Sequence, residues 1–69
     1  MSTGLNARIA ANIEAELRRR CMSVELLAYA VGMSREALTQ RLDGAGSFYT
    51  TELGAIVDYL GVPIAALLR

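Results

Sequence analysis

Apolar residues recur along this chain at the spacing of an α-helix, and nowhere do they alternate as they would in a β-strand. In the first stretch they stand at every fourth position, as Leu5, Ile9, Ile13 and Leu17. This spacing predicts a first helix over about residues 5–20, capped by Ser2 or Thr3. Because 69 residues build only one modest core, we expect an all-α fold with a single domain over residues 1–69.

Serine and glycine divide the middle of the chain into two short helices. Ser23 is placed to cap a helix over about residues 24–31, which Gly32 can end in the left-handed conformation that glycine tolerates. Ser34 is placed to cap the next helix, over about residues 35–42. Two short helices joined through a glycine in this way are expected to cross at a steep angle.

The last third of the chain predicts two more helices. After a loop over residues 44–49, a fourth helix is expected to start from a cap at Ser47 or Thr50 and to stop at Gly61. Pro63 suits the first turn of a short fifth helix. The predicted architecture is therefore a compact five-helix bundle.

The residue types that are missing exclude most enzymes. The chain has no histidine and a single cysteine, Cys21, so it lacks an internal disulfide, the usual ligands of zinc and the parts of a catalytic triad. We expect Cys21 to be a small packing residue. We expect no enzymatic activity, no metal, no cofactor and no small-molecule substrate.

Hydrophobicity is high but not arranged for a membrane. No apolar run approaches the roughly 18 residues that a membrane-spanning helix needs, and the N-terminus lacks the pattern of a secretory signal. These features predict a soluble, cytoplasmic protein that does not enter a membrane. A composition of 54% hydrophobic residues is more than so small a globule hides easily, which favours self-association.

The seven basic residues, all arginine, balance seven acidic ones to a net charge of zero. The basic residues are the more clustered of the two, because Arg18, Arg19 and Arg20 are consecutive. Cations at the negative end of a helix and contacts with phosphate both account for this cluster, and the sequence leaves the two interpretations open.

The third predicted helix has one apolar and one hydrogen-bonding side. Its apolar residues are Ala37, Leu38 and Leu42. The residues on the other side are Arg35, Glu36, Thr39, Gln40 and Asp43. One side is therefore expected to face the core, and the other to face a partner or solvent.

An ordered set of small and apolar residues extends across almost the whole chain. It consists of Met22-Ser23, Leu27-Ala28, Val31-Gly32-Met33-Ser34, Leu38, Leu42-Asp43-Gly44, Leu53, Ile56, Leu60-Gly61-Val62 and Leu67-Leu68. This set resembles the phage-repressor type of helix-turn-helix domain, the family of the lambda and 434 repressors and of Cro. The resemblance implies a lambda-repressor-like fold whose third helix lies in the major groove of double-stranded DNA.

The resemblance also implies which residues contact the DNA. The family's base-contacting positions fall on Arg35, Glu36, Thr39 and Gln40. Arginine can bind guanine, glutamine can bind adenine, glutamate can accept from the cytosine amino group, and threonine suits a thymine methyl or a phosphate. Phosphate contacts are expected from the helix starts, the third helix and the loop, at Ser23, Ser34, Arg41, Ser47 and Tyr49.

Arg41 takes a position that is usually aliphatic in the family. Its stem is expected to pack on Leu38 while its head reaches solvent or phosphate. A homodimer would double the phosphate contacts of a neutral chain. The expected dimer interface is Tyr59, Val62, Ile64, Leu67 and Leu68, although covering the monomer's own core accounts for these residues equally well.

The expected function is a sequence-specific transcriptional regulator, a repressor or Cro-like protein that reads a palindromic operator, and the resemblance alone implies a phage or prophage origin. The alternative is an adaptor or antirepressor that uses the same scaffold to bind another protein and does not touch DNA. Zero net charge favours the alternative, as does Val24, which stands where many family members have a glutamine. The hydrogen-bonding side of the third helix favours the regulator.

Overall fold

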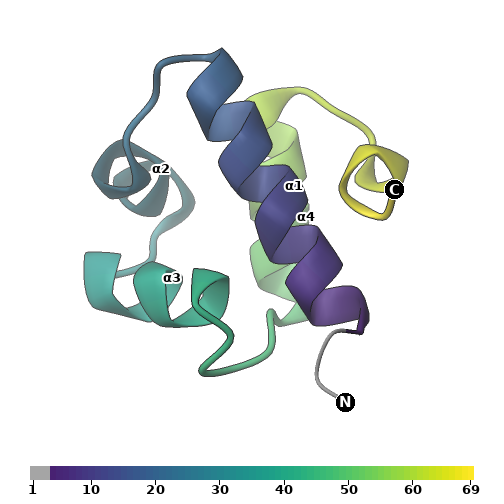
Figure 1. Ribbon diagram of the computed structural model, residues 1–69. Helices are drawn as coiled ribbons and strands as arrows, with labels where there is room; N and C mark the ends of the chain where they lie inside the picture. The colour runs from purple at the N-terminus through teal and green to yellow at the C-terminus, as the bar shows by residue number, and fades with distance from the viewer. Residues whose placement is uncertain (1–3) are drawn as a thin grey trace.

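The computed structural model describes residues 4–69, which form four α-helices and one 3-10 turn with no strand (Figure 1). The elements are α1 (Leu5–Arg19), α2 (Val24–Val31), α3 (Arg35–Leu42), α4 (Thr50–Leu60) and η1 (Ile64–Leu67). In Figure 1, α2 and α3 lie on one side of α1 and η1 lies on the other. The prediction of an all-α fold is confirmed.

The predicted fifth α-helix is wrong, because Ile64–Leu67 is a 3-10 helix of four residues. Its backbone hydrogen bonds span three residues, from Ala66 N to Pro63 O at 2.9 Å and from Leu68 N to Ala65 O at 3.1 Å. So short a segment gains too few hydrogen bonds to nucleate an α-helix. The described chain is therefore a bundle of four α-helices with a C-terminal turn.

Serine caps start the two central helices as predicted. Ser23 Oγ accepts a hydrogen bond from Leu26 N at 3.0 Å, and Ser34 Oγ accepts one from Ala37 N at 3.0 Å. Both serines have extended backbone conformations, as N-caps require. The predicted bounds of α2 and α3 are confirmed.

The other two helices start differently from the prediction. The expected caps of α1, Ser2 and Thr3, lie outside the described residues, and Gly4 is its N-cap. Neither Ser47 nor Thr50 caps α4, because Tyr49 is the N-cap and Thr50 is the first helical residue. The N-terminus of α4 is instead capped by a residue of its own first turn, because the Glu52 side chain accepts a hydrogen bond from the backbone N–H of Tyr49.

Each α-helix is followed by a residue in the left-handed conformation. Three of these are glycines with positive φ, Gly32, Gly44 and Gly61, and the fourth is Cys21 with φ 53°. Cys21 N donates to Arg18 O at 3.2 Å, and the next residue donates to Leu17 O at 2.9 Å. These bonds form a Schellman motif, which usually has glycine at this position.

Cys21 is exposed, so its predicted role as a packing residue is wrong. The left-handed residue lies beyond the end of the helix, and it is Met22, the next residue, that packs against the core.

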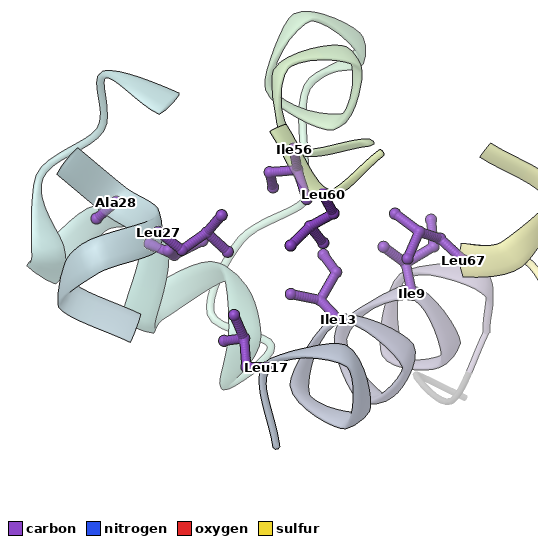
Figure 2. Close-up of a cluster of buried hydrophobic side chains, with 9 residues drawn as sticks. Ile9, Ile13, Leu17, Leu27, Ala28, Ile56, Leu60 and Leu67 are labelled. Atoms are coloured by element: carbon purple, nitrogen blue, oxygen red, sulfur yellow. The ribbon is translucent and has the colours of Figure 1, made fainter. Parts of the chain in front are cut away.

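The core draws apolar residues from every element (Figure 2). Ile13, Leu27, Leu38, Ile56 and Leu67 are fully buried. α1 packs on α3 and on η1, whereas α2 packs on α3 and α4. Within residues 4–69, no helix has the length and the apolar character that crossing a membrane requires.

Leu67 corrects one of the dimer predictions. It has no exposed surface, because η1 folds back onto α1 and inserts this side chain into the core. Leu67 therefore belongs to the monomer's own core and is not available to a second copy.

Candidate functional site

The outward side of α3 is a continuous polar surface. Arg35, Glu36, Thr39 and Gln40 are all exposed and together line one open, shallow hollow. Their spacing places them on one face of the helix, opposite Leu38, which is fully buried. The inward side of α3 thus holds the helix in place, while the outward side carries guanidinium, carboxylate, hydroxyl and amide groups.

The starts of α2 and α3 each carry backbone donors of their own. The first amides of an α-helix have no partner within the helix, and they form the positive end of its dipole. At each start a serine, Ser23 or Ser34, is exposed and uses its oxygen to accept one of these amides. Each start can therefore offer its other amides and a serine hydroxyl to an anion.

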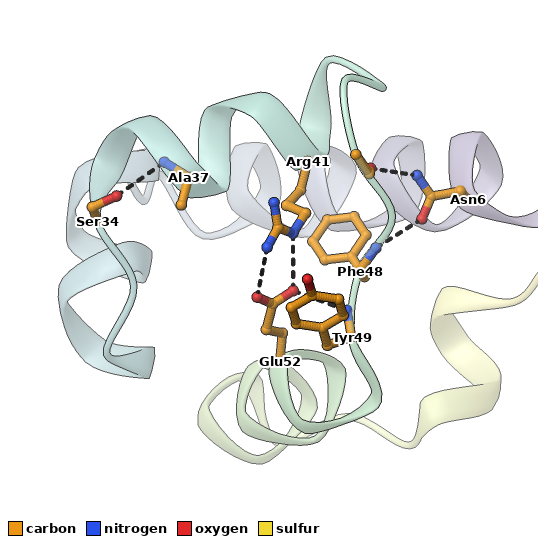
Figure 3. Close-up of polar contacts among 8 residues, drawn as sticks. Asn6, Ser34, Ala37, Arg41, Phe48, Tyr49 and Glu52 are labelled. Carbon is orange, nitrogen blue, oxygen red and sulfur yellow. Dashed lines mark hydrogen bonds and ion pairs between the residues drawn. The ribbon is translucent and has the colours of Figure 1, made fainter.

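Arg41 is only partly exposed, and its head is paired inside the molecule. Its Nε and Nη2 atoms donate to Glu52 Oε1 and Oε2 at 3.1 and 3.0 Å (Figure 3). The hydrogen bond with Glu52 raises the pKa of Arg41 above its ordinary value, and the hydrogen bond with Arg41 lowers the pKa of Glu52 below its ordinary 4.5. The guanidinium that we expected at solvent or phosphate is thus held by α4.

Tyr49 lies next to this ion pair and is 64% exposed. The guanidinium of Arg41 stands over its ring, 5.1 Å from the ring centre. The backbone N–H of Tyr49 donates to Glu52 Oε1 at 2.9 Å. Ser47, two residues earlier, is exposed as well, so the segment before α4 presents two hydroxyl side chains.

Two of the three consecutive arginines are paired locally. Arg19 and Arg20 donate to Glu16 Oε1 at 2.8 and 3.1 Å. The hydrogen bond from Arg19, and to a smaller extent the one from Arg20, lowers the pKa of Glu16. Both cations lie at the C-terminal end of α1, where the helix dipole favours them. Of the two interpretations of this cluster, the helix-end interpretation therefore accounts for Arg19 and Arg20 directly.

A second candidate surface is apolar and lies at the C-terminal end. Tyr59, Ile64 and Leu68 are exposed large hydrophobic residues, and Val62 is half-buried against the core. Four of the five residues predicted for a dimer interface are thus accessible, and only Leu67 is not. On α2, Leu26 and Tyr29 are also exposed, and Tyr29 is 85% exposed.

Sequence reasoning missed Asn6 and Glu52. Asn6 on α1 contacts the segment before α4 through two hydrogen bonds, and Glu52 contacts both Arg41 and Tyr49. The position of Glu52, three residues after an N-cap, matches the second half of a capping box, and this signal could have identified it.

No family model, curated protein or solved structure matches this chain.

Proposed function

We propose that this protein is a sequence-specific regulator that binds double-stranded DNA through α3. The observation that carries this proposal is the outward side of α3, where Arg35, Glu36, Thr39 and Gln40 are exposed together. An α-helix with its side chains is roughly 10–12 Å wide and fits a major groove about 12 Å wide. Exposed hydrogen-bonding side chains on such a helix are what base reading needs.

The chemistry of these side chains supports base-specific contacts. Arg35 can donate two parallel hydrogen bonds to guanine, and Gln40 can pair with the edge of adenine. Glu36 can accept from a cytosine amino group, and Thr39 can contact a thymine methyl or a phosphate. The four together can distinguish a short base sequence.

The arrangement of α2, the turn and α3 supports a helix-turn-helix of the lambda-repressor type. In that arrangement the second helix of the pair enters the groove, while the first crosses the DNA backbone. Ser23 and Ser34 cap the two starts, so the proposal assigns the nearby amides to phosphates. Such neutral donors matter here, because seven acidic residues balance the seven arginines and leave no net positive charge to attract phosphate.

A homodimer that reads a palindromic operator completes the proposal. Two copies double the phosphate contacts. Because each copy reads one half-site, the affinity ratio between the correct and a wrong sequence is multiplied over the two half-sites. The accessible apolar residues at the C-terminal end form the proposed interface: Tyr59, Val62, Ile64 and Leu68.

A second candidate function is a protein-binding adaptor. Exposed apolar residues on α2 favour it, because Leu26 and Tyr29 stand one helical turn apart, with 48% and 85% of their surfaces exposed, and neighbouring exposed apolar side chains are typical of contact with another protein. Zero net charge favours it as well. In this case the protein would bind another regulator and leave DNA untouched.

Selection of bound sequences from a random DNA pool at low salt, followed by affinity measurement, separates the two functions. We expect one palindromic family of duplexes to be enriched. The double variant Arg35→Ala, Gln40→Ala should then lose about 100-fold or more in affinity, since each base contact contributes roughly 1–3 kcal/mol. Arg8→Ala, which removes an exposed arginine from α1, is the matched control. If no duplex is enriched, the adaptor function replaces the regulator.

A further inference from the structure

The segment from Gly44 to Tyr49 joins α3 to α4 and is held from two sides (Figure 3). On one side is Glu52, from the first turn of α4, and on the other is Asn6, from the first turns of α1. Neither residue has a base-contacting or phosphate-contacting role in the function proposed above. Their contacts nevertheless determine where the segment lies relative to α3.

Glu52 accepts three hydrogen bonds from two residues through one carboxylate. Its Oε1 atom accepts from Arg41 Nε at 3.1 Å and from Tyr49 N at 2.9 Å, while Oε2 accepts from Arg41 Nη2 at 3.0 Å. The side chains of Arg41 and Glu52 are only 18% and 15% exposed. A paired, two-pronged contact with little access to water is geometrically specific. It therefore fixes the last turn of α3 to the residue that precedes α4.

Asn6 holds the middle of the same segment. Its Nδ2 atom donates to Gly46 O at 3.0 Å, and its Oδ1 atom accepts from Phe48 N at 3.1 Å. The backbone at Gly46 lies so close to Arg41 that an added Cβ would stand 3.3 Å from Arg41 Nη1. Phe48 packs against the core. The segment is thus fixed to α1 and pressed against a side chain of α3.

These contacts set the place of the one large exposed ring in the segment. Tyr49 is 64% exposed, and the guanidinium over its ring comes from α3 itself. The backbone of residues 46–49 is therefore fixed relative to α3, and the Tyr49 ring is held against the Arg41 guanidinium. Hydroxyl contacts to phosphate fix the register of a reading helix, whereas contacts to bases carry the sequence information.

We infer that Glu52 and Asn6 are positioning residues for DNA recognition: they hold segment 44–49 so that its contact with the DNA backbone sets the depth and register of α3 in the groove. This inference rests on the proposed DNA-binding function. In this inference Arg41 does not bind phosphate, because its guanidinium points into the protein and links α3 to Glu52 and Tyr49. Precise recognition requires such support behind the contacting side chains.

The test compares affinity for the selected duplex with affinity for a scrambled duplex of the same composition. The variants are Glu52→Ala, which removes all three bonds of the carboxylate, and Asn6→Ala, which removes the second anchor independently. Glu52→Gln keeps an acceptor for Tyr49 N and should rescue part of the effect. Glu14→Ala, a carboxylate removed from the middle of α1, is the control. Thermal unfolding of each variant shows that it is folded at the temperature of the binding measurement.

Positioning predicts a loss of discrimination. In Glu52→Ala and Asn6→Ala, the ratio of the two affinities should fall roughly tenfold, which equals the loss of about one base contact, while binding to the scrambled duplex changes little. If both duplexes lose affinity equally, or neither does, the inference is wrong. If Glu52→Ala binds every duplex more tightly with a steeper salt dependence, Arg41 is a masked phosphate ligand, and the inference is again wrong. If the wild-type chain binds no duplex, the proposed function itself fails.

Discussion

The side-chain amide of Asn12 on α1 donates a 2.8 Å hydrogen bond to the backbone carbonyl of Leu67, and a second of 3.2 Å to that of Arg69. This contact ties the C-terminal turn to the first helix. As a result two adjacent leucines have opposite environments, since Leu67 is fully buried and Leu68 is 38% exposed. The pair makes it possible to separate the stability of the monomer from its association.

Leu67→Ala should destabilise the monomer. Removing a fully buried leucine costs about 2–5 kcal/mol, from lost burial and from the cavity that remains. Urea unfolding followed by circular dichroism measures the loss as a lower transition midpoint. A change below about 1 kcal/mol would contradict the buried position of this side chain.

Leu68→Ser should cost the monomer about 1 kcal/mol, less than Leu67→Ala, because the side chain is 38% exposed and lies outside the core cluster. If the C-terminal surface is the dimer interface, the same substitution should weaken dimerisation at least tenfold. Sedimentation equilibrium of the wild-type chain and the variant measures this directly. A dimer of unchanged strength would move the interface elsewhere, and the exposed residues Leu26 and Tyr29 of α2 would be tested next.

Cys21→Gly should stabilise the protein by about 0.5–1 kcal/mol. Cys21 has φ 53°, a conformation that is strained for a residue with a Cβ and free of strain for glycine, although glycine loses more backbone freedom on folding. Thermal unfolding with the thiol kept reduced measures the effect. The converse substitution, Gly61→Ala at φ 70°, should destabilise by about 1 kcal/mol. A destabilised Cys21→Gly variant would show that the thiol makes a contact worth more than the strain.

Acid should destabilise the fold through Glu52 and Glu16. Each has a pKa below its ordinary 4.5, because Arg41 hydrogen bonds to Glu52 and Arg19 to Glu16. The unfolded chain binds these protons more readily, so the stabilisation is complete above about pH 4.5 and is lost as the pH falls through the folded-state values. The unfolding temperature should therefore drop below pH 4.5, and less steeply in Glu52→Gln. Glu14→Gln is the control, because Glu14 takes part in none of the three ion pairs.

Signals within a few residues of each other predicted the helices well, but they could not predict contacts between residues that are far apart in the sequence. The serine caps at Ser23 and Ser34 act within three residues, so the sequence alone places α2 and α3 correctly. By contrast, Asn6 bonds to Phe48 across 42 positions, and the packing of Leu67 depends on a turn that folds back onto α1. Periodicity showed that Leu67 is apolar but could not show whether it faces its own core or another chain.

The same reasoning explains the outcome for the candidate site. The outward residues of α3 follow from helix geometry once the buried side is known, and they are exposed as expected. Arg41 was expected at solvent or phosphate because it takes a position that is usually aliphatic in the family that the sequence resembles, so that its stem would pack on Leu38 and its head would turn outward. Its partner Glu52 lies 11 positions away on the next helix, and only the course of segment 44–49 between the two helices brings the two side chains together.

In α3, folding and surface chemistry are carried by separate residues. The fold depends on the Ser34 cap and on Leu38, whereas the side chains at positions 35, 36, 39 and 40 point away from the core cluster. Exchanges among polar residues at those positions should therefore cost the bundle little. A chain of this kind can acquire a different binding preference in a few mutational steps, without first becoming unstable.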